Sequence, residues 1–165
     1  MEAFVPGPET QRDLRRALGR FATGVTVVTC ESELGPLGIT ANSFASVSLD
    51  PPLVLWSPAR SSARFDAFTG AERFAIHVMS EEQVETCMRF THTGDDWTEI
   101  RWMRTPDGIP VLRDCLARFD CTRHAVHEGG DHAIVVGLVT SVTRGPGGRP
   151  LLFADGSYGR FTPDV

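Results

Sequence analysis

The segment from Gly38 to Ser46 concentrates small polar residues between two apolar stretches of the chain. Small residues let a ligand approach the backbone closely, and hydroxyl and amide groups can then hold it by hydrogen bonds. The groups of this kind belong to Thr40, Asn42, Ser43 and Ser46. The same composition is typical of a turn saturated by its own side chains, and the residues alone leave both interpretations open.

A second polar cluster, residues 57–64, follows an apolar stretch and leads into an expected helix. The N-terminus of a helix attracts phosphate through its free N–H groups and its dipole. Ser61 or Ser62 could cap this helix. Arg60 or Arg64 could bind phosphate oxygens in pairs. An ordinary helix cap with surface arginines has the same pattern and is the more common case.

Four potential metal ligands lie close together at Cys121, His124, His127 and His132. Their segment has the pattern of a strand that runs into a Gly-Gly turn, and successive side chains of a strand point to opposite faces. Cys121 and His127 therefore face away from His124, and the ligands do not converge. We predict no metal site here.

The composition excludes several other chemistries. All sixteen positively charged residues are arginine, so neither Schiff-base catalysis nor a P-loop is available. No G-x-S-x-G elbow and no G-x-G-x-x-G loop occurs. The net charge of −5, with dispersed arginines, argues against nucleic-acid binding.

The chain has the features of a protein of the cytoplasm. It has no apolar run of about 18 residues, and residues 1–8 lack the features of a signal peptide, so we expect no membrane association. Its four cysteines form no C-x-x-C pair, which favours reduced thiols.

Residue patterns predict the helices and strands that carry these groups. After a flexible lead-in at residues 1–8, helical spacing of apolar residues predicts a helix that Gly24 closes. Two further helices are predicted at 61–68 and 80–90. About seven strands are predicted, the clearest at 25–30, 53–56, 74–79, 116–126 and 132–143, with a turn at 31–38 and a long excursion at 91–113. Because turns rather than helices connect most strands, we expect one mainly β domain over residues 1–165, built as an antiparallel barrel.

Ordered motifs support a more specific interpretation. They are Thr23–Thr29, Gly38–Phe44 continuing through Ser46–Val54, Gly130–His132 leading to Gly137, and Pro150–Phe153 with Gly156 and Tyr158. Together they resemble the flavin reductase-like family over nearly the whole chain. The resemblance implies the FMN-binding split barrel, an antiparallel Greek-key β-barrel with a few flanking helices.

The resemblance also implies roles for individual residues. The residues expected to bind the flavin are Thr40, Ala41, Asn42, Ser43, Ser46, Leu55, Trp56 and Ser57. Those expected on the phosphate side are Ser62, Arg64, Arg89, Phe90 and Thr91. Those expected on the nicotinamide side are His132, Tyr158, Gly159 and Arg160. His132 is the candidate catalytic residue, acting by orientation or charge; a histidine that only bonds Asp131 is the alternative.

The implied activity is an NAD(P)H-dependent flavin reductase. It would transfer a hydride from NADH or NADPH to FMN or FAD and supply a partner monooxygenase, and it would form a homodimer. One alternative is a flavoprotein that keeps FMN bound and acts directly on a small molecule. Another is a flavin-binding module without enzymatic activity.

Three positions depart from the family pattern. Trp56 is bulkier than the small aliphatic residue expected there, His77 stands where asparagine is usual, and Ala63 replaces a frequent hydroxyl residue. These departures leave the ring-edge contacts and the flavin preference open.

Overall fold

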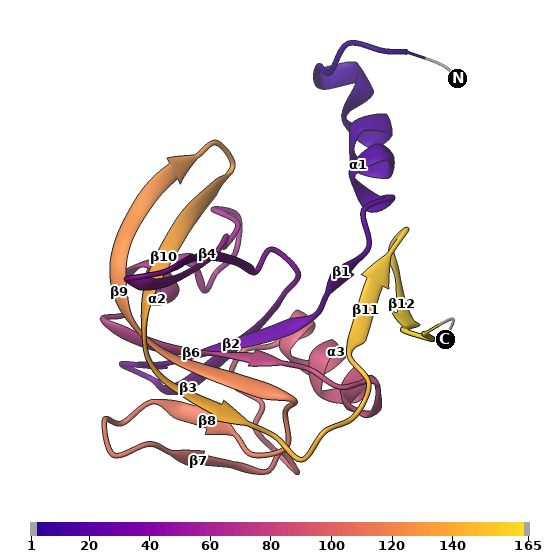
Figure 1. Cartoon of the computed structure of the whole chain (residues 1–165). Helices are drawn as coiled ribbons and strands as arrows, with labels where there is room; N and C mark the ends of the chain where they lie inside the picture. Colours follow the sequence, from indigo (N-terminus) through magenta and orange to yellow (C-terminus); the bar gives the residue numbers. More distant parts are fainter. Residues whose placement is uncertain (1–2, 164–165) are drawn as a thin grey trace.

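Twelve strands and three α-helices form within residues 3–163, the part of the chain that the computed structural model describes (Figure 1). The strands are β1 (Thr23–Gly24), β2 (Thr26–Ser32), β3 (Gly35–Ala41), β4 (Ala45–Leu49), β5 (Pro52–Trp56), β6 (Arg73–Val78), β7 (Trp102–Arg104), β8 (Pro110–Leu112), β9 (Ala117–Gly129), β10 (His132–Arg144), β11 (Leu151–Ala154) and β12 (Ser157–Arg160). The helices are α1 (Gln11–Gly19), α2 (Phe65–Gly70) and α3 (Val84–His92), with 3-10 turns η1 (Pro8–Thr10) and η2 (Glu81–Gln83).

The main sheet has seven strands in the order β3-β2-β6-β9-β10-β5-β4, and all its pairs are antiparallel. Its two edge strands, β3 and β4, are joined by only three residues, 42–44. The sheet must therefore curl until its edges approach, although they form no ladder with each other. This is a split barrel, and it confirms the mainly β, antiparallel fold predicted from the sequence.

Two large apolar clusters and a small third one, Ala75 with Ile109 and Val111, fill the interior. The barrel cluster comprises Val28, Cys30, Val54, Trp56, Phe68, Phe74, Ile76, Cys121 and Val135. The second cluster packs under α3 and comprises Val25, Val27, Met79, Cys87, Phe90, Trp97, Leu112, Cys115 and Leu151. Consecutive residues of β2 are buried because β2 lies between β3 and β6 and contributes to both clusters.

A smaller sheet, β1-β11-β12, carries the N-terminal arm, which comprises α1 and residues 20–22. Helix α1 has no buried residue and stands clear of the barrel (Figure 1). It is braced at its end, where the Asp155 N–H donates to the Gly19 carbonyl at 2.8 Å and Arg20 pairs with Asp155 at 3.0 Å. The apolar side chains whose spacing predicted this helix are therefore not buried within one chain.

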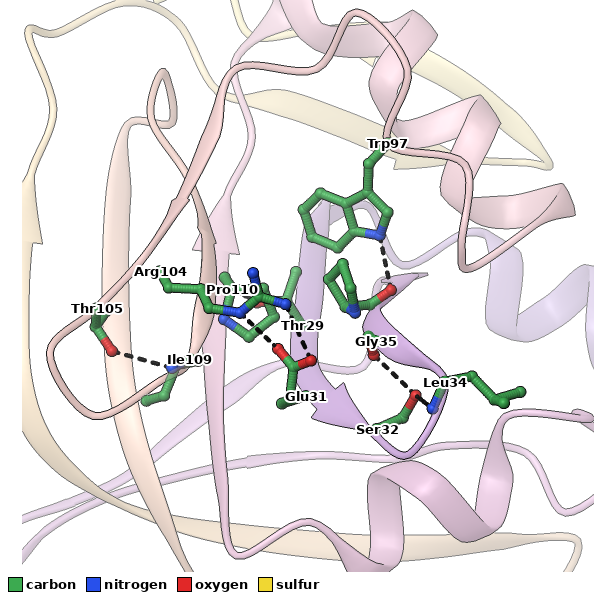
Figure 2. A network of polar contacts seen from close by, with 11 residues as sticks. Thr29, Glu31, Ser32, Leu34, Gly35, Trp97, Arg104, Thr105, Ile109 and Pro110 are labelled. Carbon is green, nitrogen blue, oxygen red and sulfur yellow. Dashed lines mark hydrogen bonds and ion pairs between the residues drawn. The ribbon is translucent and has the colours of Figure 1, made fainter.

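The excursion before β9 is fixed to the β2–β3 hairpin by a network of polar contacts (Figure 2). Arg104 on β7 donates two hydrogen bonds to the carboxylate of Glu31, at 3.0 and 3.1 Å. The indole N–H of Trp97 donates to the carbonyl of Pro36 at 2.9 Å. Trp97, which belongs to the second cluster, packs on Trp102 with ring centroids 5.0 Å apart.

Several predicted boundaries were wrong for local physical reasons. The first helix ends at Gly19 rather than Gly24, because residues 23–24 pair with β11. Residues 35–41, expected partly as a turn, form strand β3, and the hairpin turn takes only residues 33–34. Residues 3–163 form twelve strands rather than the seven predicted, and some of the additional ones, such as β1 and β7, are only two or three residues long.

The four cysteines are buried and free. Burial raises the pKa of the thiols of Cys30, Cys87 and Cys121 to about 12, so these thiols stay protonated. Residues 3–163 contain no group of three or more histidine, cysteine, aspartate or glutamate side chains placed to hold a metal. None of the helices within those residues is both long and apolar enough to cross a membrane.

Candidate active site

The segment after β3 is bound to the end of β5 through one serine pair. The hydroxyl of Ser43 accepts a hydrogen bond from the Ser57 N–H at 2.9 Å and lies 3.4 Å from the Ser57 carbonyl, to which it can donate. Thr40, at the end of β3, donates its hydroxyl hydrogen bond to the Cys87 carbonyl of α3 at 2.6 Å. These bonds connect the predicted flavin segment at residues 40–46 to Ser57, at the end of β5, and to α3, whose last turn carries residues 89–91. Asn42 and Ser46 are exposed at the rim of this region.

Strand β5 divides its side chains between the core and the candidate site. Trp56 is buried in the barrel cluster, where its ring packs edge-on against Phe68 with centroids 5.3 Å apart. Leu55 and Ser57, on the opposite face of the strand, are half-buried. Any contact of Trp56 with a flavin would therefore come from its backbone. The bulk of Trp56 is accommodated in the core, not at the rim of the site.

The start of β10 places His132 beside the segment that follows β5. The Ala133 N–H donates to the Pro58 carbonyl at 3.1 Å, and the Arg60 N–H donates to the Asp131 carbonyl at 2.9 Å. The Nδ1 atom of His132 lies 2.8 Å from a carboxylate oxygen of Asp131. This hydrogen bond holds the pKa of the exposed Asp131 carboxyl below its ordinary value. It orients the half-buried imidazole, as both interpretations of His132 require.

The arginines expected near phosphate all have partners within the chain. Arg89 pairs with Asp96 at 3.5 Å and also bonds the Thr98 carbonyl. Arg60 pairs with Glu128 and donates to the Gly130 carbonyl at 3.1 Å. The guanidinium of Arg64 donates to backbone carbonyls around the end of α3.

The other residues expected on the phosphate side are divided between core and surface. The ring of Phe90 is fully buried, so only its backbone faces this region. Thr91 is exposed and donates its hydroxyl to the Cys87 carbonyl at 2.9 Å.

The helix expected at 61–68 begins later, at Phe65. Residues 59–65 instead form turns in which the Ser62 N–H bonds the Ala59 carbonyl and the Phe65 N–H bonds the Ser62 carbonyl, both at 3.0 Å. The Ser62 hydroxyl accepts from the Arg64 N–H at 3.2 Å, and Arg64 is the residue that precedes α2. Neither Ser61 nor Ser62 caps the helix, so the predicted cap was wrong, whereas phosphate binding by Ser62 and Arg64 stays a prediction.

The predicted nicotinamide residues fall into two separate places. His132 lies beside the β5 end, whereas Tyr158, Gly159 and Arg160 lie on β12 of the smaller sheet. Tyr158 packs against Phe153 with centroids 5.5 Å apart, and Arg160 lies 3.8 Å from Glu81. Within residues 3–163, no hydrogen bond or ion pair joins β12 to the His132 segment.

Contact geometry gives two glycines a packing role that the sequence did not indicate. Gly38 lies against the Phe90 ring, since a β-carbon there would be 2.6 Å from it. Gly94 lies against Arg64 in the same way, at 2.6 Å from its Cδ. These glycines are necessary because β3, α3 and the turn before α2 pack closely together there. No sequence pattern predicts this close packing.

The chemistry of the assembled site is that of binding and positioning. Its donors are the hydroxyls of Ser43 and Ser57, the exposed amide of Asn42 and the ring of His132. No Ser-His or Cys-His hydrogen bond is present among residues 3–163, and the cysteines are buried. Uncharged hydroxyl and amide groups suit the polar edge of a flavin ring, so the residues fit that ligand. A bound flavin would supply a two-electron acceptor for a nicotinamide hydride.

Known proteins of this architecture define the class. The solved structure of the NADH:FAD oxidoreductase SgcE6 from Streptomyces globisporus, in complex with NAD and FAD fragments, aligns with a TM-score of 0.90 at 38% identity, covering 99% of each chain. The flavin reductase PheA2 aligns with a TM-score of 0.84 at 33% identity, covering 93% of this chain and 99% of its own. Fold and site together therefore place the molecule among the split-barrel flavin reductases.

The chain belongs to the flavin reductase-like domain family, whose model matches residues 18–162. The FMN reductase (NADH) SmoA from Agrobacterium fabrum is 53% identical over 159 residues, which is 96% of this chain and 91% of SmoA. HsaB from Rhodococcus jostii, the reductase subunit of a flavin-dependent monooxygenase, is 41% identical over 154 residues, 93% of this chain and 79% of HsaB. The family predicted from the sequence motifs is confirmed.

Proposed function

We propose that this protein is an NADH:flavin oxidoreductase that reduces FMN or FAD and delivers the reduced flavin to a partner monooxygenase. The observation that carries the proposal is the convergence of three segments, Thr40–Ser43, Leu55–Ser57 and the start of β10 with His132, through the hydrogen bonds described above. Hydride transfer between two bound cofactors depends mostly on positioning, which such a site supplies without a catalytic triad. The 53% identity to an FMN reductase that uses NADH favours that pair of substrates.

The test is anaerobic mixing of the protein with NADH and flavin while the absorbance of oxidised flavin is followed. We expect NADH-dependent bleaching that scales with protein concentration. Repeating the assay with FMN and FAD, each paired with NADH and NADPH, identifies the preferred substrates. No bleaching with any pair would contradict the proposal.

His132 is expected to act on hydride transfer more than on flavin binding. In the His132→Ala variant, the rate of flavin reduction at saturating substrates should fall by about tenfold or more, because an oriented polar group beside the reacting rings is lost. The dissociation constant for flavin should change by less than about threefold. Stopped-flow reduction and flavin titration measure the two quantities. His124→Ala, on the exposed part of β9, is the matched control.

We also propose that the protein forms a homodimer through its N-terminal arm, α1 and residues 20–22. The apolar side chains of Leu18 and Phe21 are 66% and 78% exposed, and Leu14 precedes them at helical spacing. The arm carries four of the sixteen arginines, whereas residues 21–165 contain 18 acidic residues and 12 arginines. A basic arm with an apolar face therefore complements the acidic body of a second copy.

The double substitution Leu18→Gln with Phe21→Gln is expected to convert the dimer into a monomer, because the apolar face of the arm is lost. Analytical ultracentrifugation measures the mass. Leu34→Gln is the control, since Leu34 is fully exposed on the β2–β3 turn. A monomeric wild-type protein, or a double variant that stays dimeric, would refute the arm as the interface.

We place the protein in the cytoplasm, where NADH and reduced thiols are available. Its four free, buried cysteines are suited to that compartment. The expected partner is a monooxygenase, because relatives such as HsaB are reductase subunits of flavin-dependent monooxygenases. An assay that couples the reduced flavin to an added monooxygenase would test this assignment.

A further inference from the structure

Arg64 reaches from the turn before α2 to two other elements. Its Nη1 atom donates to the carbonyls of Gly38 on β3, at 3.0 Å, and of Phe90 on α3, at 2.7 Å. Nη1 also lies 3.3 Å from the carbonyl of Thr93, and Nη2 donates to the carbonyl of Thr91 at 3.2 Å. One guanidinium thus binds four carbonyls, and the bonds connect the end of α3 to the edge strand β3.

The surrounding backbone leaves little freedom for this arrangement. The Gly38 N–H donates to the Gly94 carbonyl at 2.8 Å, which ties the segment after α3 directly to β3. A β-carbon on Gly94 would lie 2.6 Å from the Cδ of Arg64 and 2.9 Å from the Gly38 carbonyl oxygen. A β-carbon on Gly38 would lie 2.6 Å from the Phe90 ring. The two glycines are therefore what allow Arg64 and Phe90 to approach β3.

The carbonyls that Arg64 binds include those at the C-terminal end of a helix. The last carbonyls of a helix have no partner within it, and they carry the negative end of its dipole. An anion such as the flavin phosphate would be repelled by them. The bound guanidinium both satisfies these carbonyls and neutralises the end of α3.

The bonds of Arg64 also fix the segments expected to surround the flavin. Arg89–Thr91 lie at the end of α3, and Thr40 follows Gly38 by two residues on β3. Thr40 is itself bonded to α3 through the Cys87 carbonyl. Displacement of α3 from β3 would therefore move both segments relative to each other.

We propose that Arg64 is a positioning residue: it holds the end of α3 against β3, and so sets the spacing of the flavin segments, instead of binding the flavin phosphate directly. This inference rests on the proposed flavin-binding function. It assigns Arg64 a role that does not depend on the phosphate group. Loss of the side chain should then weaken the binding of any flavin, with or without phosphate.

The test compares Arg64→Met with the wild type for binding of FMN and of riboflavin, which lacks the phosphate. Quenching of flavin fluorescence on titration gives both dissociation constants. We expect Arg64→Met to raise both by a similar factor of about ten. KM for flavin should rise in parallel, while kcat at saturating flavin stays within about threefold. Arg64→Lys, which keeps a cation but only three donors, should restore part of the affinity for both flavins.

Arg123→Met is the matched control, because Arg123 also donates to a backbone carbonyl, that of Thr69, but lies on β9 away from α3. It should leave both dissociation constants unchanged. A loss confined to FMN would make Arg64 a phosphate ligand and overturn the inference, as would an unchanged affinity for both flavins. If riboflavin binds too weakly to titrate, the salt dependence of FMN binding decides. An unchanged slope in Arg64→Met supports positioning, and a reduced slope overturns it.

Neither a folding failure of the variant nor a failure of the proposed function can be mistaken for a failure of the positioning role. If Arg64→Met does not fold, the same comparison is made with Arg64→Lys, where equal losses for the two flavins support the inference and a loss for FMN alone refutes it. A failure of the proposed function would show in the wild type as absence of NADH-dependent flavin reduction. A failure of the positioning role shows only in the variants.

Discussion

Replacing Gly145 by alanine is expected to lower the free energy of unfolding by about 3 kcal/mol, because a β-carbon has no space at this position. It would lie 1.9 Å from the carbonyl oxygen of Cys115, a backbone atom that cannot rotate away as a flexible side chain can. The Gly145 N–H also donates to the Leu116 carbonyl at 2.8 Å. The substitution must separate the two segments and break this bond.

The same change should reach the nicotinamide side of the site. Gly145 directly follows β10, and the chain then leads to the β11–β12 hairpin, which carries Tyr158, Gly159 and Arg160. Displacement of this connection would shift the hairpin, so KM for NADH is expected to rise by about tenfold.

Urea unfolding followed by circular dichroism measures the loss of stability. Gly70→Ala is the control, because no atom lies within 4 Å of a β-carbon at the end of α2. It should change stability by less than about 1 kcal/mol. If Gly145→Ala unfolds at the wild-type midpoint, the close approach to Cys115 does not exist in solution.

The strands were predictable because their residues satisfy local and tertiary requirements together. Val25–Cys30 is rich in β-branched residues, and the position of β2 between two neighbours buries this run. The helix predicted at 80–90 was confirmed as η2 followed by α3, where the Ser80 N–H donates to the side chain of Gln83 at 3.0 Å. These features depend on neighbouring residues, so the sequence displays them directly.

Features that depend on distant contacts were not predictable. The turn at 59–65 delays α2 because Ser62 bonds Arg64 and Ala59 locally, and because Arg60 is held by the β9–β10 hairpin, seventy residues away. Arg64 was expected near phosphate because it belongs to the polar cluster of residues 57–64, yet its partners come from β3 and α3. The candidate site was thus predictable as a set of segments, but not as a set of hydrogen bonds.

Trp56 shows, on a single strand, the difference between features set by neighbouring residues and features set by distant contacts. Its size departs from the family pattern and could have altered the flavin site. Alternation along β5 sends the indole into the barrel core instead, against Phe68 and Phe74. The departure is therefore a matter of core packing. The sequence does not reveal it, because residues 53–56 are all apolar and do not show which face of the strand is buried.

His77, a second departure from the family pattern, is buried as a neutral ring with both nitrogens bonded. Nε2 accepts the Leu112 N–H at 3.0 Å, so the proton must be on Nδ1, which donates to the Val27 carbonyl at 2.9 Å. Burial, reinforced by the charge of Arg118, lowers the pKa of the imidazole from 6.5 to about 4. The ring joins β6 to β2 and β8 only while it is neutral, because a protonated Nε2 could not accept from Leu112.

His77→Ala is expected to lower the free energy of unfolding at neutral pH by about 4 kcal/mol, since it opens a cavity and leaves two buried backbone groups unsatisfied. The wild type should also lose stability below pH 6.5. The unfolded chain takes up a proton there, whereas the folded ring does not until about pH 4. The free energy of unfolding should fall with a slope that approaches about 1.4 kcal/mol per pH unit, to a full loss of about 3 kcal/mol. Above pH 6.5 no loss from this group is expected.

His77→Asn separates this titration from that of the other ionisable groups. The asparagine amide can still donate to Val27 and has no proton to gain, so the difference in stability between wild type and variant should shrink as the pH falls from about 6.5 toward 5. Urea unfolding of both proteins across that range measures it. His124→Asn, the same change at an exposed histidine on β9, should run parallel to the wild type. A constant difference between the wild type and His77→Asn would mean that the ring takes up its proton in the folded protein at the same pH as in the unfolded chain, and that the bond from the Leu112 N–H does not hold it neutral.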